Sequence, residues 1–190
     1  MLTGEQFARY LLEKEGFSHY LVKQGRLNSQ FRYSKGKVPT IFLLKQHQDH
    51  KEESLLVAAH EVGHALDLID KGRYDSVRYY FYGYILSNLI TFFTPIFFLP
   101  VLIFGIASCM AYIKTESAAD AHKRNLVKKY LRDAYHQYDD SRSPDEVVQL
   151  AENRLKTDRK QTYRIAILYF IVFPLIVHTS AFSFWVDLVI

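Results

Sequence analysis

The feature that most constrains this chain is the distribution of its charges. All 24 lysines and arginines fall in residues 1–78 and 114–164. Residues 79–113 contain no Asp, Glu, Lys, Arg or His, and residues 165–190 contain one histidine and one aspartate among these types. Uncharged stretches of this length are typical of membrane-embedded helices. We therefore expect a mainly α-helical membrane protein.

The remaining composition narrows the function classes. The formal net charge is +4, but the basic residues are interleaved with carboxylates and flank the apolar segments. Positive-inside bias explains this excess, so nucleic acid is not an expected partner. The single cysteine, Cys109, excludes a disulfide framework and a cysteine-rich metal site. The first residues, MLTGEQFARYLLEKEG, lack the apolar run of a signal peptide, which predicts a cytoplasmic amino terminus.

Local patterns predict one helix and one hairpin in the first polar segment. Thr3 supplies an N-cap for an amphipathic helix over residues 3–14 that ends near Gly16. Residues 30–44 contain two β-prone runs around a Ser-Lys-Gly-Lys turn, which predicts a β-hairpin. Because Pro39 cannot donate a ladder hydrogen bond, we expect its strand at an edge of the sheet.

Two capping patterns predict further helices. Asp49 and Glu52 have capping-box spacing, which favours a helix from about His50 to Ile69. The sequence Ser-Pro-Asp-Glu at 143–146 predicts the start of another helix, which we expect to continue into the last apolar segment. Inside the first of these helices, Gly63 costs about 1 kcal/mol relative to alanine, so either close packing or close substrate approach requires it.

The candidate functional residues are His60, Glu61 and His64, which belong to the motif HEVGH at 60–64. On a helix the two imidazoles lie one turn apart on one face and can bind one metal ion, with Glu61 beside them as a base toward water. This arrangement is typical of zinc hydrolases, and the neighbouring hairpin could bind an extended peptide by strand addition.

A catalytic zinc needs a third protein ligand and an open position, and Glu116 in ESAAD is the candidate. It begins a predicted helix that runs to about Tyr138. Asp120, one turn later, can hydrogen-bond the far nitrogen of a ligand histidine. His122 is a candidate hydrogen-bond donor to the transition state. The predicted site is therefore Zn²⁺ held by His60, His64 and Glu116.

This site constrains the topology. Because Glu116 must lie on the same side of the membrane as the two histidines, residues 79–113 must cross an even number of times. We expect a hairpin of two short helices, about Tyr79–Phe93 and Ile96–Ile113, with a re-entrant pair as the alternative. Positive-inside counting places the site in the cytoplasm and lets residues 165–190 cross once. The four expected parts are 1–78, 79–113, 114–164 and 165–190.

Five stretches resemble a known family: TGEQFARYLLEKEG, GRL at 25–27, LLVAAHEVGHAL, ESAADA and SPDEVVQLAENRL. They lie between residues 3 and 155, so the resemblance extends over most of the chain. The family that they resemble is the neutral zinc metallopeptidases of bacterial membranes, the YugP-like group. The ESAAD spacing also resembles that of HtpX-type membrane peptidases. The resemblance implies a gluzincin-type enzyme with a zincin-like helical core in the bacterial inner membrane. Its ligands would be His60, His64 and Glu116, and its base Glu61.

The expected function is hydrolysis of peptide bonds in membrane or membrane-proximal proteins, with the lipid bilayer as the other partner. The alternative is a membrane scaffold or partner-binding module with a structural zinc, which has no use for Glu61. A third interpretation has the helix over 3–14 lie on the bilayer and control access. The sequence leaves the oligomeric state, the cleavage specificity and the native metal open.

Overall fold

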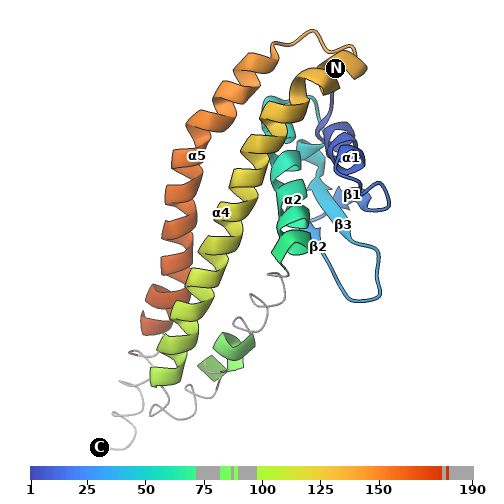
Figure 1. Ribbon diagram of the computed structural model, residues 1–190. Helices are drawn as coiled ribbons and strands as arrows, with labels where there is room; N and C mark the ends of the chain where they lie inside the picture. The colour runs from blue at the N-terminus through green and yellow to red at the C-terminus, as the bar shows by residue number, and fades with distance from the viewer. Residues whose placement is uncertain (72–81, 87, 90–97, 177–178, 180–190) are drawn as a thin grey trace, which may run out of the picture. The chain divides into compact units, whose positions relative to one another are not determined.

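The computed structural model describes residues 1–71, 82–86, 88–89, 98–176 and 179 (Figure 1). The described chain is mainly helical with one three-stranded sheet, which confirms the expected fold class at this level. Its contacts divide the chain into two units. The first comprises Met1–Lys71 and Ser117–Thr157, and the second comprises Gly72–Glu116 and Asp158–Ile190.

Helix α1 (Gly4–Lys14) has the predicted amino-terminal cap. The Thr3 hydroxyl accepts the backbone N–H of Gln6 at 3.1 Å, and the Gln6 side chain accepts the N–H of Thr3 at 2.9 Å, which forms a capping box. Phe7 and Leu11 are fully buried, and the helix packs on helix α2 (Glu52–Lys71). This apolar face is covered by the first unit, so the interpretation that it lies on a bilayer is wrong.

The sheet consists of β1 (Leu21–Gly25), β2 (Gln30–Arg32) and β3 (Thr40–Leu44), in the order β1-β3-β2. The antiparallel pair β2–β3 is the predicted hairpin, and β1, which the sequence did not predict, pairs parallel to β3. The expectation that the strand after Pro39 lies at an edge is wrong, because β3 is central. Pro39 precedes the strand, and its carbonyl accepts the N–H of Leu21 at 3.0 Å.

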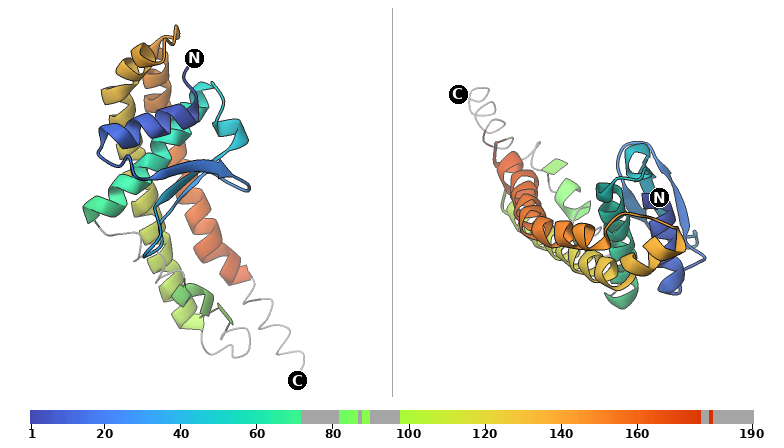
Figure 2. Two further views of the ribbon diagram at one scale, coloured as in Figure 1. Left: turned by 90° about the vertical axis from the view of Figure 1, so that its right-hand side faces the viewer. Right: turned by 90° about the horizontal axis from the view of Figure 1, so that it is seen from above.

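Helix α2 (Glu52–Lys71) carries the HEVGH motif. It begins two residues later than predicted. The Asp49 carboxylate accepts the Lys51 N–H at 3.1 Å and the Ser54 hydroxyl at 2.6 Å, and does not cap a helix that begins at His50. The hydrogen bond from Ser54 lowers the pKa of Asp49. Within the first unit, α2 lies between the sheet and helix α4 (Phe98–Gln137; Figure 1, Figure 2).

Helix α4 (Phe98–Gln137) is a single helix of 40 residues. The sequence predicted two helices here, about Ile96–Ile113 and Glu116 to about Tyr138. The structure has one continuous helix instead, because no glycine or proline lies between Ile106 and Gln137 to stop it. Pro100 is in the first turn, where a missing N–H costs nothing. Of the other expected membrane helix, over 79–93, residues 82–86 and 88–89 are helical and the rest lie outside the described residues.

Helix α5 (Pro144–Ile167) begins at the predicted proline and continues through a π-helical turn, Leu168–Val172, to Ile176. The prediction that it runs into the last apolar segment is confirmed over these residues. Most of the remaining segment lies outside the described residues, so the expected carboxyl-terminal crossing stays a prediction.

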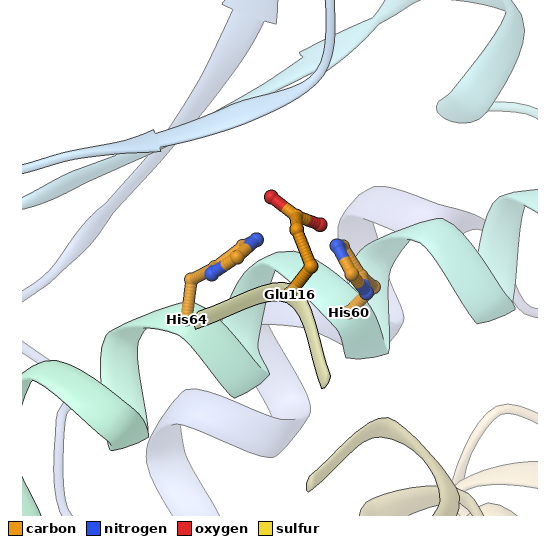
Figure 3. A group of neighbouring side chains, drawn as sticks. All are labelled: His60, His64 and Glu116. Carbon is orange, nitrogen blue, oxygen red and sulfur yellow. The ribbon is translucent and has the colours of Figure 1, made fainter. Parts of the chain in front are cut away.

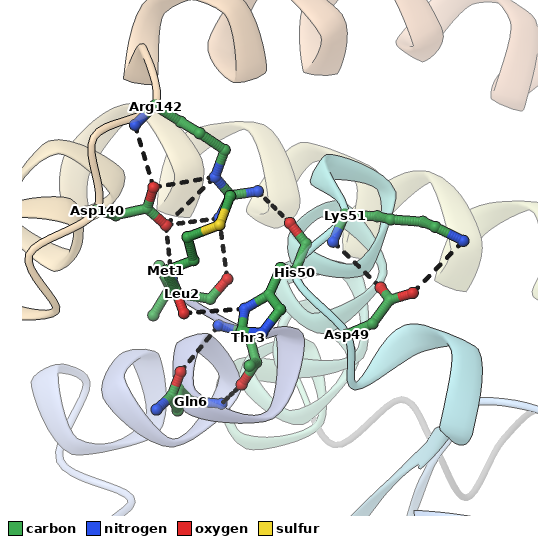
Figure 4. A network of polar contacts seen from close by, with 9 residues as sticks. All are labelled: Met1, Leu2, Thr3, Gln6, Asp49, His50, Lys51, Asp140 and Arg142. Atoms are coloured by element: carbon green, nitrogen blue, oxygen red, sulfur yellow. Dashed lines mark hydrogen bonds and ion pairs between the residues drawn. The ribbon is translucent and has the colours of Figure 1, made fainter.

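A polar network fixes the amino terminus of the first unit (Figure 4). The Asp140 carboxylate is fully buried and accepts the Leu2 N–H and the Arg142 guanidinium. Arg142 also donates to the carbonyls of Leu2 and His50. Arg142 holds the pKa of Asp140 well below its usual range. The network therefore ties the first residues and the segment before α2 to the turn between α4 and α5.

One helix among the described residues, Leu99–Gln137, is long and apolar enough to cross a membrane by length and composition. Its apolar half presents a stripe of exposed side chains one turn apart: Leu99, Ile103, Ile106 and Met110. Such a stripe on the outside of a soluble helix would be unusual, and its position agrees with the expected membrane segment.

Candidate metal centre

Helix α2 places His60 and His64 on one face, as the HEVGH spacing predicts. Their ring centroids are 4.7 Å apart and their planes are nearly perpendicular. Both side chains are half-buried, whereas residues on the opposite side of the helix are fully buried and anchor it to the first unit. These anchoring residues are Leu55, Ala58, Ala59, Val62 and Ala65. The histidines are therefore held at the margin of the core.

Glu116 joins the two histidines (Figure 3). One ligand atom from each of His60, His64 and Glu116 lies within 4.8 Å of the others, so the three could hold one metal ion. In the view of Figure 3 the Glu116 carboxylate lies between the two rings. Two imidazoles and one carboxylate are a donor set that transition metals such as zinc accept.

Gly63 explains why α4 approaches α2 so closely. A Cβ added to Gly63 would stand 2.6 Å from the Ala119 carbonyl oxygen and 3.1 Å from the Cβ of His122. A side chain here would therefore push the backbone of α4 away. Gly63 is therefore explained by close packing of α2 against α4. This helix contact lies one residue before His64.

Asp120 contacts the far nitrogen of a candidate ligand, as the sequence predicted. Its Oδ1 lies 3.0 Å from Nδ1 of His60, and the carboxylate is buried. With Nδ1–H donating to a carboxylate, Nε2 of His60 remains available for a metal ion. Burial raises the pKa of Asp120, but hydrogen bonds from His60 and Lys123 and the charge of Lys123 outweigh it, so the pKa lies below its ordinary value.

Lys123 is a residue of this cluster that the sequence did not single out. Its Nζ lies 2.8 Å from Oδ1 of Asp120, and its side chain is 6% exposed. The available signal was the spacing of Glu116, Asp120 and Lys123, which occupy positions i, i+4 and i+7 of one helix and therefore share a face. A lysine on the same helix face as two candidate carboxylates indicates an ion pair.

The two other predicted residues lie on the same pair of helices. Glu61 lies on α2 beside His60 and is 6% exposed. His122 lies on α4 with its Cβ against Gly63, at the crossing of the helices. The roles expected for them, base and transition-state donor, stay predictions.

Comparison with known proteins adds no assignment: no family model, no curated protein and no solved structure matches the chain. The resemblance to membrane zinc peptidases therefore stays an expectation. The candidate site is a His-His-Glu group on two closely crossing helices, with a buried Asp–Lys pair behind one histidine.

Proposed function

We propose that this protein is a membrane-embedded zinc metalloendopeptidase of the gluzincin type, with a zincin-like core. The observation that carries the proposal is the proximity of His60, His64 and Glu116, whose ligand atoms lie within 4.8 Å of one another. Glu61 belongs to the same motif and supplies a buried carboxylate next to a ligand. This combination is what a zinc hydrolase requires.

The donor count favours a catalytic over a structural metal. Structural zinc sites usually have four protein ligands, whereas catalytic sites have three and an open position. Among the described residues, the group consists of three ligand side chains. The fourth position would be available for water or for the carbonyl oxygen of a substrate.

The residues divide the chemistry as follows. Bound zinc would supply a Lewis acid that polarises the scissile carbonyl and acidifies a water molecule. The Glu61 carboxylate accepts a proton from the attacking water and returns it to the nitrogen of the leaving amine. Asp120 holds His60 by Nδ1, so that Nε2 faces the metal position. His122 is proposed as a donor to the developing oxyanion.

An edge of the sheet offers a way to align the substrate. Strand β2 is an edge strand, and it contacts α2. An extended peptide that pairs with such an edge gains main-chain hydrogen bonds whatever its sequence. We therefore expect substrates to bind in extended form and to be recognised only weakly by side-chain identity.

The continuity of α4 favours substrates near a membrane. Glu116 follows the last residue of the uncharged stretch, Ile113, by three positions in one helix, which is about 4.5 Å along its axis. We propose that residues 79–113 and 165–190 lie in the bacterial inner membrane and that the site faces the cytoplasm, on the side rich in lysine and arginine. The substrates are then membrane proteins or peptides at the surface.

Metal removal tests the function. We expect the detergent-purified protein to cleave a single-pass membrane reporter whose flexible cytoplasmic segment follows its membrane helix directly. Treatment with 1,10-phenanthroline followed by dialysis should lower the rate by about a hundredfold or more, and stoichiometric Zn²⁺ should restore it, because the Lewis acid is lost and regained. The reporter fragments are quantified by gel and mass spectrometry.

A matched reporter carries the same segment behind a long folded spacer and serves as the control for membrane proximity. It should be cleaved more slowly. Cleavage that continues at the full rate in the metal-free protein would contradict the proposal, and equal rates on both reporters would contradict the membrane-proximal substrate.

A further inference from the structure

Lys123 lies at a buried position of α4, where an apolar side chain would be expected. Apart from Asp120 and Tyr135, the other residues of α4 that are buried in the first unit are aliphatic: Ala119, Leu126, Val127, Leu131 and Ala134. Lysine is rarely buried, because removing its ammonium group from water is unfavourable unless a partner compensates. Its presence at 5% exposure therefore requires a specific partner.

That partner is the carboxylate behind the candidate ligand. Nζ of Lys123 lies 2.8 Å from Oδ1 of Asp120, and Nδ1 of His60 lies 3.0 Å from the same oxygen atom. The side chains of Lys123 and Asp120 are 6% and 8% exposed, so little water competes for either contact. Helical side chains lean toward the amino terminus, so a lysine three positions after Asp120 reaches back to it.

Two donors on one oxygen fix the direction of the carboxylate. With one donor only, Asp120 could rotate about its side-chain torsions and release His60, whose imidazole could then turn or adopt the other tautomer. With both donors, the order Lys123–Asp120–His60 leaves Nε2 of His60 directed away from the carboxylate. The arrangement extends the familiar carboxylate–histidine pair by one residue.

We propose that Lys123 is a positioning residue for the metal centre: its ammonium group holds Asp120 in place, and Asp120 holds His60 with Nε2 presented to the metal. This inference rests on the metal site proposed above. It assigns Lys123 no contact with substrate or metal. A buried ion pair is by itself weak evidence for stability, and its replacement by apolar residues is often neutral, so a positioning role and a stability role predict different results.

Zinc affinity and the tautomer of His60 test the role in the full chain. Zinc affinity is measured by competition with a chromophoric chelator. The tautomer is measured in the metal-free protein by ¹⁵N NMR of labelled histidine, with His60→Gln to assign the signal. We expect Lys123→Met to lower zinc affinity by about 10- to 100-fold, and to convert a single Nδ1–H tautomer of His60 into a mixture. Lys123→Arg, which retains the charge and the donors, should recover most of both properties.

Lys128→Met is the matched control, because Lys128 lies on the same helix and forms an ion pair with Glu152, but on an exposed surface. It should leave zinc affinity and the His60 tautomer unchanged. If Lys123→Met fails to fold, as judged by thermal melting in detergent, Lys123→Gln, which retains a donor without the charge, takes its place.

The outcomes separate this inference from the proposed function. Folded Lys123 variants with wild-type zinc affinity and an unchanged His60 tautomer would overturn the role of Lys123 and leave the metal site intact. A wild-type protein that binds no zinc would overturn the proposed function, while the tautomer in the metal-free protein would still decide whether Lys123 positions His60.

Discussion

Glu61→Gln should lower the rate of peptide hydrolysis by about a hundredfold to ten-thousandfold, the range observed when a general base is removed. Glutamine has nearly the same shape as glutamate but cannot accept the proton of the attacking water. Glu61 is not one of the three ligand side chains, so zinc should remain bound at about one ion per chain. The rate is measured on the membrane reporter and the metal by elemental analysis of the same preparation.

Glu53→Gln is the matched control for this variant. Glu53 lies on the same helix and pairs with Arg154, with its side chain 54% exposed. The substitution changes the charge of α2 equally, and hydrolysis should continue at the wild-type rate. Hydrolysis by Glu61→Gln at the wild-type rate would contradict the proposed mechanism. Bound zinc without turnover in the wild type, in every substrate tried, would favour a scaffold with a structural metal.

Gly63→Ala should weaken zinc binding although it changes no ligand. Helix propensity alone favours alanine over glycine by about 1 kcal/mol. The added Cβ, however, would stand 2.6 Å from the carbonyl oxygen of Ala119, and backbone cannot rotate out of the way. Glu116 and Asp120 flank Ala119 on the same helix, so they must move with it. We expect zinc affinity to fall by about 10- to 100-fold, as for loss of a supporting contact.

Gly105→Ala provides the comparison, because it creates a clash of the same kind far from the metal. Its Cβ would stand 2.4 Å from the Phe170 carbonyl oxygen, and Gly105 precedes Glu116 by eleven positions on α4. This variant should be less stable in a detergent melt, but its zinc affinity should equal that of the wild type. Wild-type affinity in Gly63→Ala would show that the close crossing does not set the metal geometry.

The sequence predicted well the features that depend on neighbouring residues. The N-cap at Thr3, the start of α5 at Pro144 and the one-turn spacing of His60 and His64 each involve side chains fewer than five positions apart. Such contacts are encoded by local pattern, because the same residues meet whenever the helix forms. The sequence also predicted a contact of Asp120 with one of the ligand histidines, because a zinc site needs such a partner; in the structure this histidine is His60.

The features of the fold that depend on tertiary contacts could not be predicted from local sequence patterns. Strand β1 and the central position of β3 arise from pairing between segments that are distant in the sequence. The residues around Pro39 give no information about this pairing. The change from apolar to charged residues near residue 114 predicts a helix boundary, but a helix continues wherever helix breakers are absent, so α4 is continuous. Lys123 was missed because its burial is a property of the packed unit.

Elemental analysis of the purified protein, beside His64→Ala and Glu116→Ala, tests the central claim most directly. We expect about one zinc per wild-type chain and a large loss in both variants, since each removes one of three ligands. His136→Ala, which removes an exposed histidine from α4, should retain the metal. Zinc retained in Glu116→Ala but lost in His64→Ala would contradict the shared site and, with it, the argument that residues 79–113 cross the membrane an even number of times.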